Sequence, residues 1–327
     1  MRRAFFLLLL ILGLTVQAPA QMSHGQAEAQ PKKAIVLAAF GSTHASALKA
    51  ILGVEAKVRA AFPGLPVRLA FTSNMIRNVW HSRAAAPDFQ QRYPGVPEEI
   101  TSVPSLLGAL AELSDAGYRD VAVQSLHIAA GEEFDDVTKT VAGLRSIKMA
   151  QAKNNPFAKI VLGRPAMGLA QDGDDADLAV AAKALAQDAT QSKAEGAALL
   201  YVGHGNPRRP NQKTYARLQA ALRQAYPGQP LLVSALELPG SKEAAIKALH
   251  SLGAKKVILL PLLLVAGDHA ANDLCGSEAD SWAPTLIKAG FEMDCRQRGL
   301  GEVDAFGDIY LDHLRQAMTG LDHDGSR

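Results

Sequence analysis

Residues 257–265 read VILLPLLLV, and residues 266–273 continue as AGDHAAND. The apolar run is too short for a membrane-spanning helix, which needs about 20 such residues. It is typical of a strand buried on both faces, as in a parallel sheet covered by helices. Functional residues in such sheets lie at the carboxyl ends of the strands. The glycine, the carboxylates and the histidine after the run are therefore the first candidates for a site.

The rest of the chain alternates segments typical of strands and of helices, which indicates βαβ units and a parallel sheet. The other predicted strands are 33–39, 65–71, 120–126, 159–162, 197–202 and 230–235. Apolar periodicity and helix-ending glycines predict helices that include 46–61, 106–116 and 241–252. The 6% aromatic content beside 48% hydrophobic residues fits an aliphatic core of this kind.

The second half of the chain repeats features of the first half in the same order. The matches are Phe62-Pro63-Gly64 with Tyr226-Pro227-Gly228, Gly41 with Gly203, and Ala130-Gly131 with Ala266-Gly267. Their offsets are 164, 162 and 136 residues, so the first half should contain an insertion, which we assign to 77–100. One match among common Pro-Gly turns could be coincidence, but three in order indicate a duplication.

The duplication predicts an α/β fold of two similar Rossmann-like domains, each a parallel sheet flanked by helices, with a cleft between them. We expect an N-terminal domain at 32–165 and a C-terminal domain at 166–327. The last helix is expected to pack on the N-terminal domain.

The N-terminus has the features of an export signal. Residues 1–3 carry positive charge, residues 4–16 are apolar and uncharged, and Ala18-Pro19-Ala20 fits a small-residue cleavage site. A membrane anchor is the alternative, but the run is short for a span. We predict a signal peptide at 1–20 cleaved near Ala20, a flexible leader at 21–31, and a periplasmic mature protein outside the membrane.

Charge and cysteine content narrow the range of partners. The formal net charge of +2 is too near zero to favour nucleic acid or an anionic membrane surface. The two cysteines, Cys275 and Cys295, are equally compatible with a disulfide and with two free thiols. Closed homo-oligomers are common among soluble proteins, so we expect a homo-oligomer.

Three predicted strand ends of the second half carry side chains that ligate metals. These are His204, Glu237 and His269, where the first half has Ser42, Ser73 and Glu133. Since the first half shares the fold without the histidines, folding alone does not require them. Two imidazoles and one carboxylate at neighbouring strand ends suit a divalent transition metal. We predict that these three residues bind the metal and act in catalysis.

Two pairs near these strand ends each allow two interpretations. Arg208 and Arg209 are equally compatible with holding substrate carboxylates and with a solvated basic turn. Glu132 and Glu133 fit a proton-accepting or metal-entry pair, but acids are also favourable at the start of a helix.

Five further residues also allow two interpretations each. His127 ends a predicted strand and fits a site residue as well as a hydrogen-bonded core histidine. Asp268, Asn272 and Asp273 either orient His269 from outside the metal site or cap a helix. His81 follows a tryptophan in a polar segment, where a haem-iron ligand and an exposed bystander are the two interpretations.

Several familiar motifs are missing from the sequence. It has no Gly-x-x-x-x-Gly-Lys-Ser/Thr loop, no Gly-x-Gly-x-x-Gly after the first strand, and no Gly-x-Ser-x-Gly elbow. A Rossmann-like fold without the dinucleotide motif argues against a hydride-transfer enzyme.

Five segments together resemble one known family. They are LAAFGST at 37–43, FTSNMI at 71–76, LHIAAGEEF at 126–134, VGHGN at 202–206 and VAGDHAAND at 265–273. In these the chain resembles the anaerobic-type sirohydrochlorin cobaltochelatases, class II chelatases whose wider superfamily includes protoporphyrin ferrochelatase. The resemblance runs from about residue 33 to 317, and GDHAAND with the downstream DSW at 280–282 is its most specific part.

The resemblance implies that a tetrapyrrole lies in the cleft and receives Co²⁺ while two protons leave. It also places His204, Glu237 and His269 at metal-binding and catalytic positions. The residues expected on the substrate side are Ser42, Thr43, Ser73, His127, Glu132, Glu133, Arg208 and Arg209.

Two alternatives remain beside cobalt insertion. Imidazole and carboxylate also accept Fe²⁺, so a sirohydrochlorin ferrochelatase has the same residue pattern. A periplasmic carrier of metal or haem that shares the chelatase fold is the other alternative.

Overall fold

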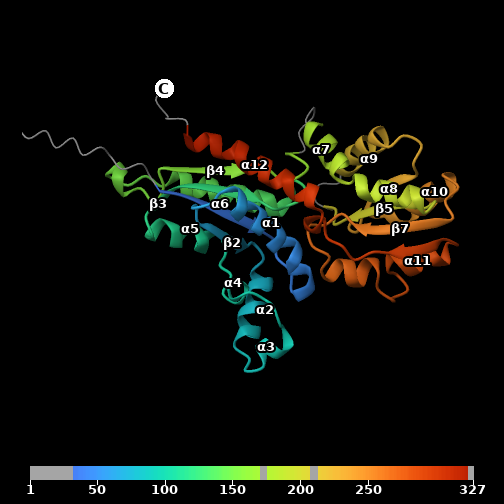
Figure 1. The fold of residues 1–327 in the computed structure, drawn as a ribbon, viewed down its shortest axis with the longest axis horizontal. Helices are drawn as coiled ribbons and strands as arrows, with labels where there is room; N and C mark the ends of the chain where they lie inside the picture. The colour runs from blue at the N-terminus through green and yellow to red at the C-terminus, as the bar shows by residue number, and fades with distance from the viewer. Residues whose placement is uncertain (1–31, 170–174, 207–212, 323–327) are drawn as a thin grey trace, which may run out of the picture. The chain divides into compact units, whose positions relative to one another are not determined.

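The computed structural model describes residues 32–169, 175–206 and 213–322. The predicted signal peptide and leader, together with Arg208 and Arg209, lie outside these residues. The described residues form two four-stranded sheets, and every strand pair in both sheets is parallel. Figure 1 shows both sheets with the helices around them. Within the described ranges, no helix has the length and apolar character needed to cross a bilayer.

The two sheets have the same strand order. The first is β2-β1-β3-β4 and the second is β6-β5-β7-β8. The strands of the first sheet are β1 (Lys32–Ala39), β2 (Val67–Phe71), β3 (Tyr118–Ser125) and β4 (Lys159–Gly163). Those of the second are β5 (Ala198–Gly203), β6 (Leu231–Ala235), β7 (Lys256–Pro261) and β8 (Glu292–Cys295).

Helices cover both faces of each sheet. The first sheet lies between α1 (Leu48–Ala61) with α12 (Asp304–Asp322) and α5 (Leu106–Asp115) with α6 (Glu132–Ser146). The second lies between α7 (Ala176–Ala184) with α9 (Thr214–Ala225) and α10 (Ser241–Ser251) with α11 (Trp282–Lys288). Short helical segments are η1 (Ala45–Ala47), η2 (Ala152–Asn154), η3 (Ala270–Leu274) and η4 (Leu300–Glu302).

The alternation of side chains along β1 explains this layering. Ile35 and Leu37 face one core and Ala34 and Val36 face the other, because successive residues of a strand point to opposite faces. Both faces are apolar, as expected for strands covered by helices on each side. The predicted fold class, with two Rossmann-like parallel sheets, is thereby confirmed.

The helices that follow the fourth strand of each sheet are exchanged between the halves. Helix α7 follows β4 but packs on α9, and the next helix, α8 (Ala186–Ala194), packs on β5. Helix α12 follows β8 but packs on β3 and β4, where Tyr310 Oη donates a hydrogen bond to the Leu126 carbonyl at 3.2 Å. The second half is therefore completed by α7, which follows the first sheet in the chain. The first half is completed by α12, which follows the second sheet.

The strand register corrects one of the matches between the halves. Ile35 pairs with Val67 and Leu199 pairs with Leu231, so both strands repeat with an offset of 164 residues. His204 therefore corresponds to Phe40, and Gly205 (φ +89°) corresponds to Gly41 (φ +99°). The predicted match of Gly41 with Gly203 was wrong by two residues, because it aligned glycines by type rather than by their place in the ladder.

The apolar run at 257–265 forms a shorter strand than its composition predicts, since β7 ends at Pro261. Beyond that point the carbonyls of Leu263 and Leu264 accept hydrogen bonds from Leu300 and Gly301, at 2.8 and 2.9 Å. The chain has thus left the sheet and pairs with the segment that leads to α12. The apolar residues after Pro261 are buried against that segment rather than between strands.

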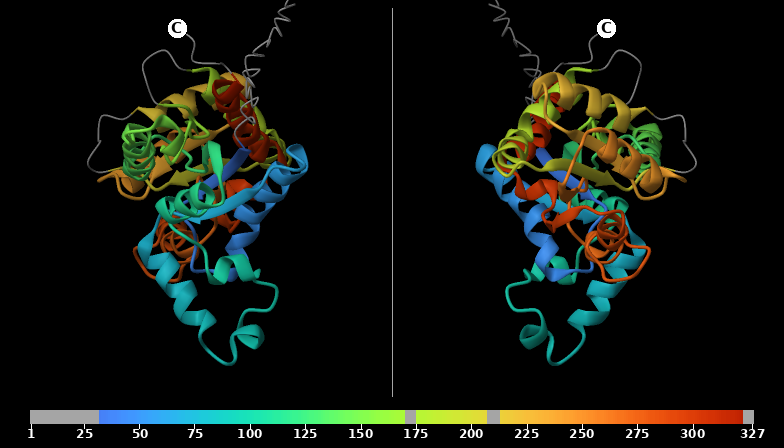
Figure 2. Two further views of the ribbon diagram at one scale, coloured as in Figure 1. Left: turned by 90° about the vertical axis from the view of Figure 1, so that its left-hand side faces the viewer. Right: turned by 90° about the vertical axis from the view of Figure 1, so that its right-hand side faces the viewer.

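The insertion in the first half is helical. It lies between β2 and α5 and contains α2 (Asn74–Ala84), α3 (Phe89–Arg92) and α4 (Glu98–Thr101). Both views of Figure 2 show these helices, in cyan, projecting away from the sheets. In the second half a short loop connects β6 directly to α10.

Candidate functional site

The ends of β5 and β6 place His204 beside Glu237. The Glu237 amide donates to the His204 carbonyl at 2.9 Å, and the Leu236 amide donates to the Gly203 carbonyl at 2.8 Å. These bonds continue the parallel ladder one step beyond the strands. As a result, Nδ1 of His204 lies 3.4 Å from a carboxylate oxygen of Glu237.

His269 reaches the same place from the loop after β7. Its ring lies edge-on to that of His204, with centroids 4.9 Å apart and an interplanar angle of 79°. All three side chains are partly exposed. Across residues 32–169, 175–206 and 213–322, no three His, Cys, Asp or Glu side chains converge closely enough to hold a metal ion. The arrangement is open, unlike the closed four-ligand cage of a structural metal site.

Among the described residues, both imidazoles make their polar contacts through Nδ1, which leaves Nε2 for a metal. Nδ1 of His204 lies 3.2 Å from the Gly205 carbonyl, and Nδ1 of His269 lies 2.6 Å from a carboxylate oxygen of Asp273. A carbonyl or carboxylate oxygen only accepts hydrogen bonds, so Nδ1 carries the proton in each ring. The lone pair on Nε2 remains available to a metal, which is the usual arrangement for a ligating histidine.

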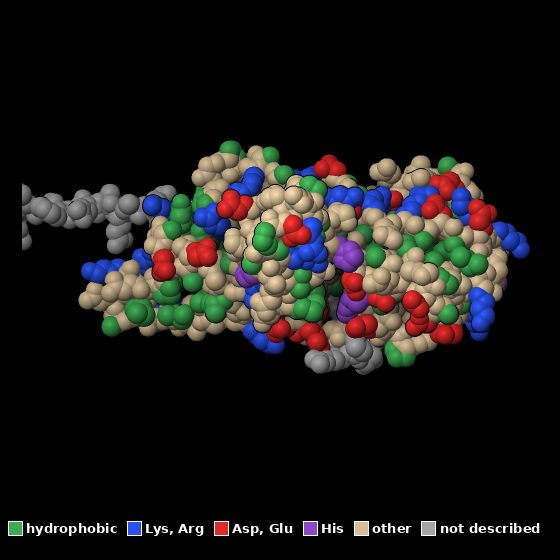
Figure 3. Space-filling view, turned by 90° about the horizontal axis from the view of Figure 1, so that it is seen from below, with side chains coloured by type: hydrophobic (Ala, Val, Ile, Leu, Met, Phe, Trp, Pro, Cys, Tyr) green, Lys and Arg blue, Asp and Glu red, His purple; other side chains and the backbone are tan. Residues whose placement is uncertain are grey.

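Loops of the first half face this cluster. A Cβ placed on Gly267 would lie 2.9 Å from Ser42 Oγ, and one placed on Gly131 would lie 3.9 Å from Asn206 Nδ2. The loops after β1 and β3 therefore lie against those after β7 and β5. In Figure 3, histidine side chains (purple) border a hollow with acidic side chains (red) beside them.

The inserted helix α2 fixes the loop that carries Ser42 and Thr43. The indole Nε1 of Trp80 donates to the Ser42 carbonyl at 2.7 Å, and the Arg83 guanidinium donates to the Thr43 carbonyl. Ser73 caps the same helix by accepting from the Ile76 amide at 3.4 Å. Ser42 is buried, while Thr43 and Ser73 are partly buried.

His127 lies directly after β3, with Nδ1 2.8 Å from Ser125 Oγ. Burial lowers the pKa of His127 to about 4, so the ring is neutral at pH 7. Among the residues that the structure describes, its buried Nε2 has no hydrogen-bond partner.

Further acidic side chains lie on the segments that carry or face the two site histidines. Glu132 and Glu133 occupy the first turn of α6, where the helix dipole favours them. Asp268 accepts from the Asn272 side-chain amide at 2.9 Å and lies 3.5 Å from Nε2 of His44. A cluster of this sign attracts a dication.

Three residues near the site were missed by sequence reasoning. Phe40 is 45% exposed at the carboxyl end of β1 and holds the position that corresponds to His204. His44 bridges to Asp268 from the other half, and Tyr215 accepts a hydrogen bond from the Gly205 amide. The signal for Phe40 was the strand register, since an offset of 164 residues aligns it with His204. The other two depend on contacts between segments distant in sequence.

The haem candidate His81 is tied to the backbone. Its Nε2 lies 3.1 Å from the Val103 carbonyl, so this nitrogen donates a hydrogen bond and would have to give it up to ligate iron.

Cys275 and Cys295 form a disulfide between the segment after η3 and the end of β8. This bond resolves the question that the sequence left open. It anchors the segment that follows His269 and Asp273.

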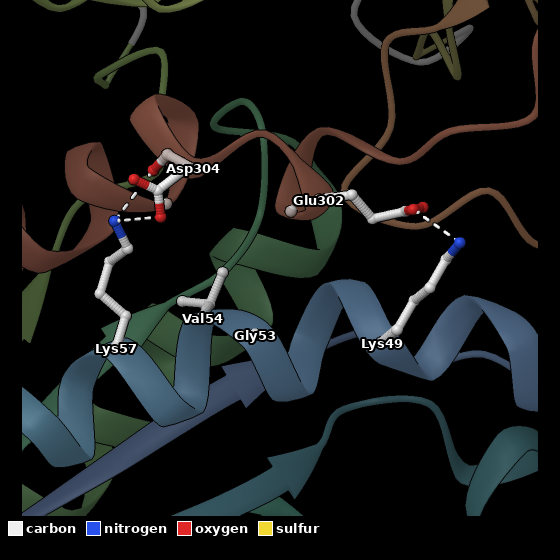
Figure 4. A pocket seen from close by; sticks show the side chains of 8 residues that line it. Lys49, Gly53, Val54, Lys57, Glu302 and Asp304 are labelled. Carbon is white, nitrogen blue, oxygen red and sulfur yellow. Dashed lines mark hydrogen bonds and ion pairs between the residues drawn. The ribbon is translucent and has the colours of Figure 1, made fainter.

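Described residues form one hollow beside Glu237 and another away from the histidine cluster. One of about 370 Å³ is lined by residues 236–243 and so includes Glu237. The other, of about 310 Å³, lies between α1 and the start of α12 (Figure 4). Its two lysines are paired with acids, Lys49 with Glu302 and Lys57 with Asp304, both at 2.8 Å. Their charges are compensated, so this second hollow has no unpaired charge for a ligand.

Comparison with known proteins identifies the family. Residues 33–319 match the family model described as cobalt chelatase (CbiK). The chain belongs to the cobalt chelatase (CbiK) family. The resemblance predicted from the five sequence segments is confirmed.

Two named relatives are similar to this chain over most of its length. The sirohydrochlorin cobaltochelatase CbiKC of Nitratidesulfovibrio vulgaris is 33% identical over 293 residues, covering 89% of this chain and 92% of that protein. The sirohydrochlorin cobaltochelatase of Salmonella typhimurium is 30% identical over 290 residues, covering 88% and 97%.

Solved structures share the fold. SirB from Bacillus subtilis with Fe³⁺ superposes with a TM-score of 0.55 at 13% identity, covering 89% of this chain and 97% of that one. The sirohydrochlorin chelatase SirB from Bacillus subtilis subspecies spizizenii, in complex with cobalt, gives a TM-score of 0.52 at 13% identity, covering 88% and 96%. At this identity the likeness concerns the fold alone.

Proposed function

We propose that this protein inserts Co²⁺ into sirohydrochlorin and releases two protons. The observation that carries the proposal is the pair of imidazoles with free Nε2 atoms beside Glu237, facing the loops of the other half. The names of the two relatives supply the substrate class.

In this mechanism His204 and His269 hold the substrate cobalt on one face of the macrocycle. An open pair of imidazoles suits transient holding, because the metal must leave the protein for the four ring nitrogens. Glu237 accepts a pyrrole proton as each nitrogen binds the metal, and passes it to solvent. Holding the ring bent exposes its nitrogen lone pairs, and contacts to the periphery of the ring offset the strain.

The test is cobalt insertion measured by the absorption change of sirohydrochlorin, with wild type, His204→Ala, His269→Ala and Glu237→Gln. We expect each variant to lose at least about 100-fold in kcat/KM, in line with the loss of a general base or ligand. His250→Ala, on the exposed side of α10, is the matched control. Near-normal insertion by folded His204→Ala and His269→Ala would rule out the proposed roles.

The same assay separates the alternatives. A carrier stops after one equivalent of metal, whereas a chelatase turns over many times. Replacing Co²⁺ by Fe²⁺ at equal free concentration compares the two metals, and a higher kcat/KM with Fe²⁺ would favour a ferrochelatase.

Periplasmic location and homo-oligomeric state are further proposals, supported by the N-terminal sequence and by the general frequency of closed oligomers. Fractionation of cells that produce the full chain tests the first, with an N-terminally truncated chain as control. Light scattering of the purified protein tests the second.

Haem ligation by His81 also stays a proposal, supported by an exposed imidazole in the insertion. The site fits poorly while Nε2 is bonded to Val103. A Soret band in the purified protein that disappears in His81→Ala would support it, and its absence after incubation with haemin would reject it.

A further inference from the structure

Tyr215 lies in α9 directly beneath the turn that carries His204. The Gly205 amide donates a hydrogen bond to its hydroxyl at 3.2 Å. A Cβ on Gly203 would lie 2.6 Å from the Tyr215 ring, closer than any real contact of this kind. The ring therefore occupies space that only a glycine at 203 leaves open.

In the first half, the positions equivalent to Gly203 and Tyr215 hold two other residues. Helices α1 and α9 end at the same offset as the strands, at Phe62 and Tyr226, which have nearly identical backbone angles. With an offset of 164, Gly203 corresponds to Ala39 and Tyr215 to Ile51. Ala39 and Ile51 belong to the same buried core. The fold is thus built in the first half without either the glycine or the hydroxyl.

The surroundings keep the phenol of Tyr215 neutral. Burial raises the pKa of Tyr215, and the carboxylates of Glu133 and Glu237 raise the pKa further. Glu133 belongs to the first half and Glu237 to the second. The phenol therefore stays protonated while it accepts the hydrogen bond from Gly205.

We propose that Tyr215 is a positioning residue of the cobalt site: its ring fills the space left by Gly203, and its hydroxyl holds the Gly205 amide so that the turn presents His204 beside Glu237. This inference rests on the proposed role of His204 in binding the substrate metal. Tyr215 itself touches neither the metal nor the macrocycle in this arrangement. A purely structural role would be limited to filling the core.

Four variants separate positioning from core filling. Tyr215→Phe removes only the oxygen. Gly203→Ala introduces the clash with the ring, and Tyr215→Ile introduces the first-half residue. The double variant Gly203→Ala/Tyr215→Ile introduces the first-half pair, Ala39 and Ile51, at both positions. These two residues already pack together in the core of the first half.

The measurements are thermal stability, the dissociation constant for Co²⁺ without tetrapyrrole, and hydrogen exchange of the Gly205 amide. We expect Tyr215→Phe to unfold at nearly the wild-type temperature but to bind Co²⁺ about fivefold more weakly, as the loss of one net hydrogen bond predicts. Its Gly205 amide should exchange faster. Gly203→Ala alone should be destabilised, and the double variant should recover stability without recovering cobalt affinity.

Tyr215→Phe and a stable double variant that both bind Co²⁺ as tightly as wild type would overturn the inference. Unchanged protection of the Gly205 amide in Tyr215→Phe would overturn it as well, whether or not the protein binds cobalt. Failure of wild type to metallate sirohydrochlorin would instead count against the proposed function, because cobalt binding and amide exchange are measured without the macrocycle.

Discussion

A carboxylate oxygen of Asp273 lies 2.6 Å from Nδ1 of His269, four residues earlier in the chain. His269 is the N-cap of η3 and Asp273 lies within it. The carboxylate therefore fixes both the rotation of the imidazole and the position of its proton. Such partners raise the basicity of the ligating nitrogen.

Replacing this carboxylate should weaken the metal site. We expect Asp273→Asn to lower Co²⁺ affinity about 10- to 100-fold, the range for second partners of ligating histidines. Isothermal titration with Co²⁺ measures the change. Asp268→Asn is the matched control, since it removes the same charge next to His269 but contacts His44 and Asn272 instead. An equal loss of Co²⁺ affinity in both variants would show that the negative charge near His269, and not the hydrogen bond from its Nδ1, strengthens metal binding.

The disulfide should stabilise the loop after β7. Cys275 and Cys295 are 20 residues apart, and closing a loop of this size stabilises a fold by about 3 kcal/mol. Cys275→Ser/Cys295→Ser should lower the free energy of unfolding by this amount, as measured by urea denaturation. A reductant should shift the midpoint of wild type and leave the double variant unchanged. A wild-type midpoint that does not respond to complete reduction would contradict this prediction.

His127 should make stability fall in acid. Its folded pKa of about 4 lies below the ordinary 6.5, so between these values the unfolded chain binds a proton that the folded protein does not. The free energy of unfolding therefore drops as pH falls from 6.5 towards 4, with about 2 kcal/mol lost between pH 7 and 5. In His127→Asn this loss should be smaller by that amount. His313, whose pKa burial also lowers, is present in both proteins and cancels in the comparison.

Phe40 should contact the macrocycle rather than the metal. It is exposed at the position that corresponds to His204, on the opposite side of the site. Covering half of a phenyl ring contributes about 1.4 kcal/mol, so Phe40→Ala should raise the KM for sirohydrochlorin about tenfold. Co²⁺ affinity should not change. Leu107→Ala, exposed on α5, is the control, and an unchanged KM in Phe40→Ala would exclude the contact.

Sequence reasoning succeeded where the information is local. The alternating strands and helices predicted the parallel sheets, and the recurrence of Pro-Gly helix ends predicted the duplication. The comparison of the halves singled out His204, Glu237 and His269, which the structure places together. It did so because a duplicated fold shows directly which residues folding does not need.

Sequence reasoning failed where the outcome depends on distant segments. Strand β7 ends at Pro261 because the residues after it pair with residues 300–301. No local sequence pattern predicts this pairing. The match of Gly41 with Gly203 failed because glycine identity is weaker evidence than ladder register. Tyr215 was missed because its approach to Gly203 appears only once α9 is packed beside β6. Pairing of the cysteines likewise needed the approach of η3 to β8.

The exchange of α7 and α12 has a consequence for synthesis. The first sheet emerges from the ribosome early, but α12, the helix that covers β3 and β4, is made only after the whole second sheet. Until α12 is available, the part of that face over β3 and β4 lacks this cover, although α1 already packs beside β2. Complete folding of the first half thus waits for the synthesis of α12, and a chain cut short before this helix would leave the first sheet partly uncovered and prone to aggregate.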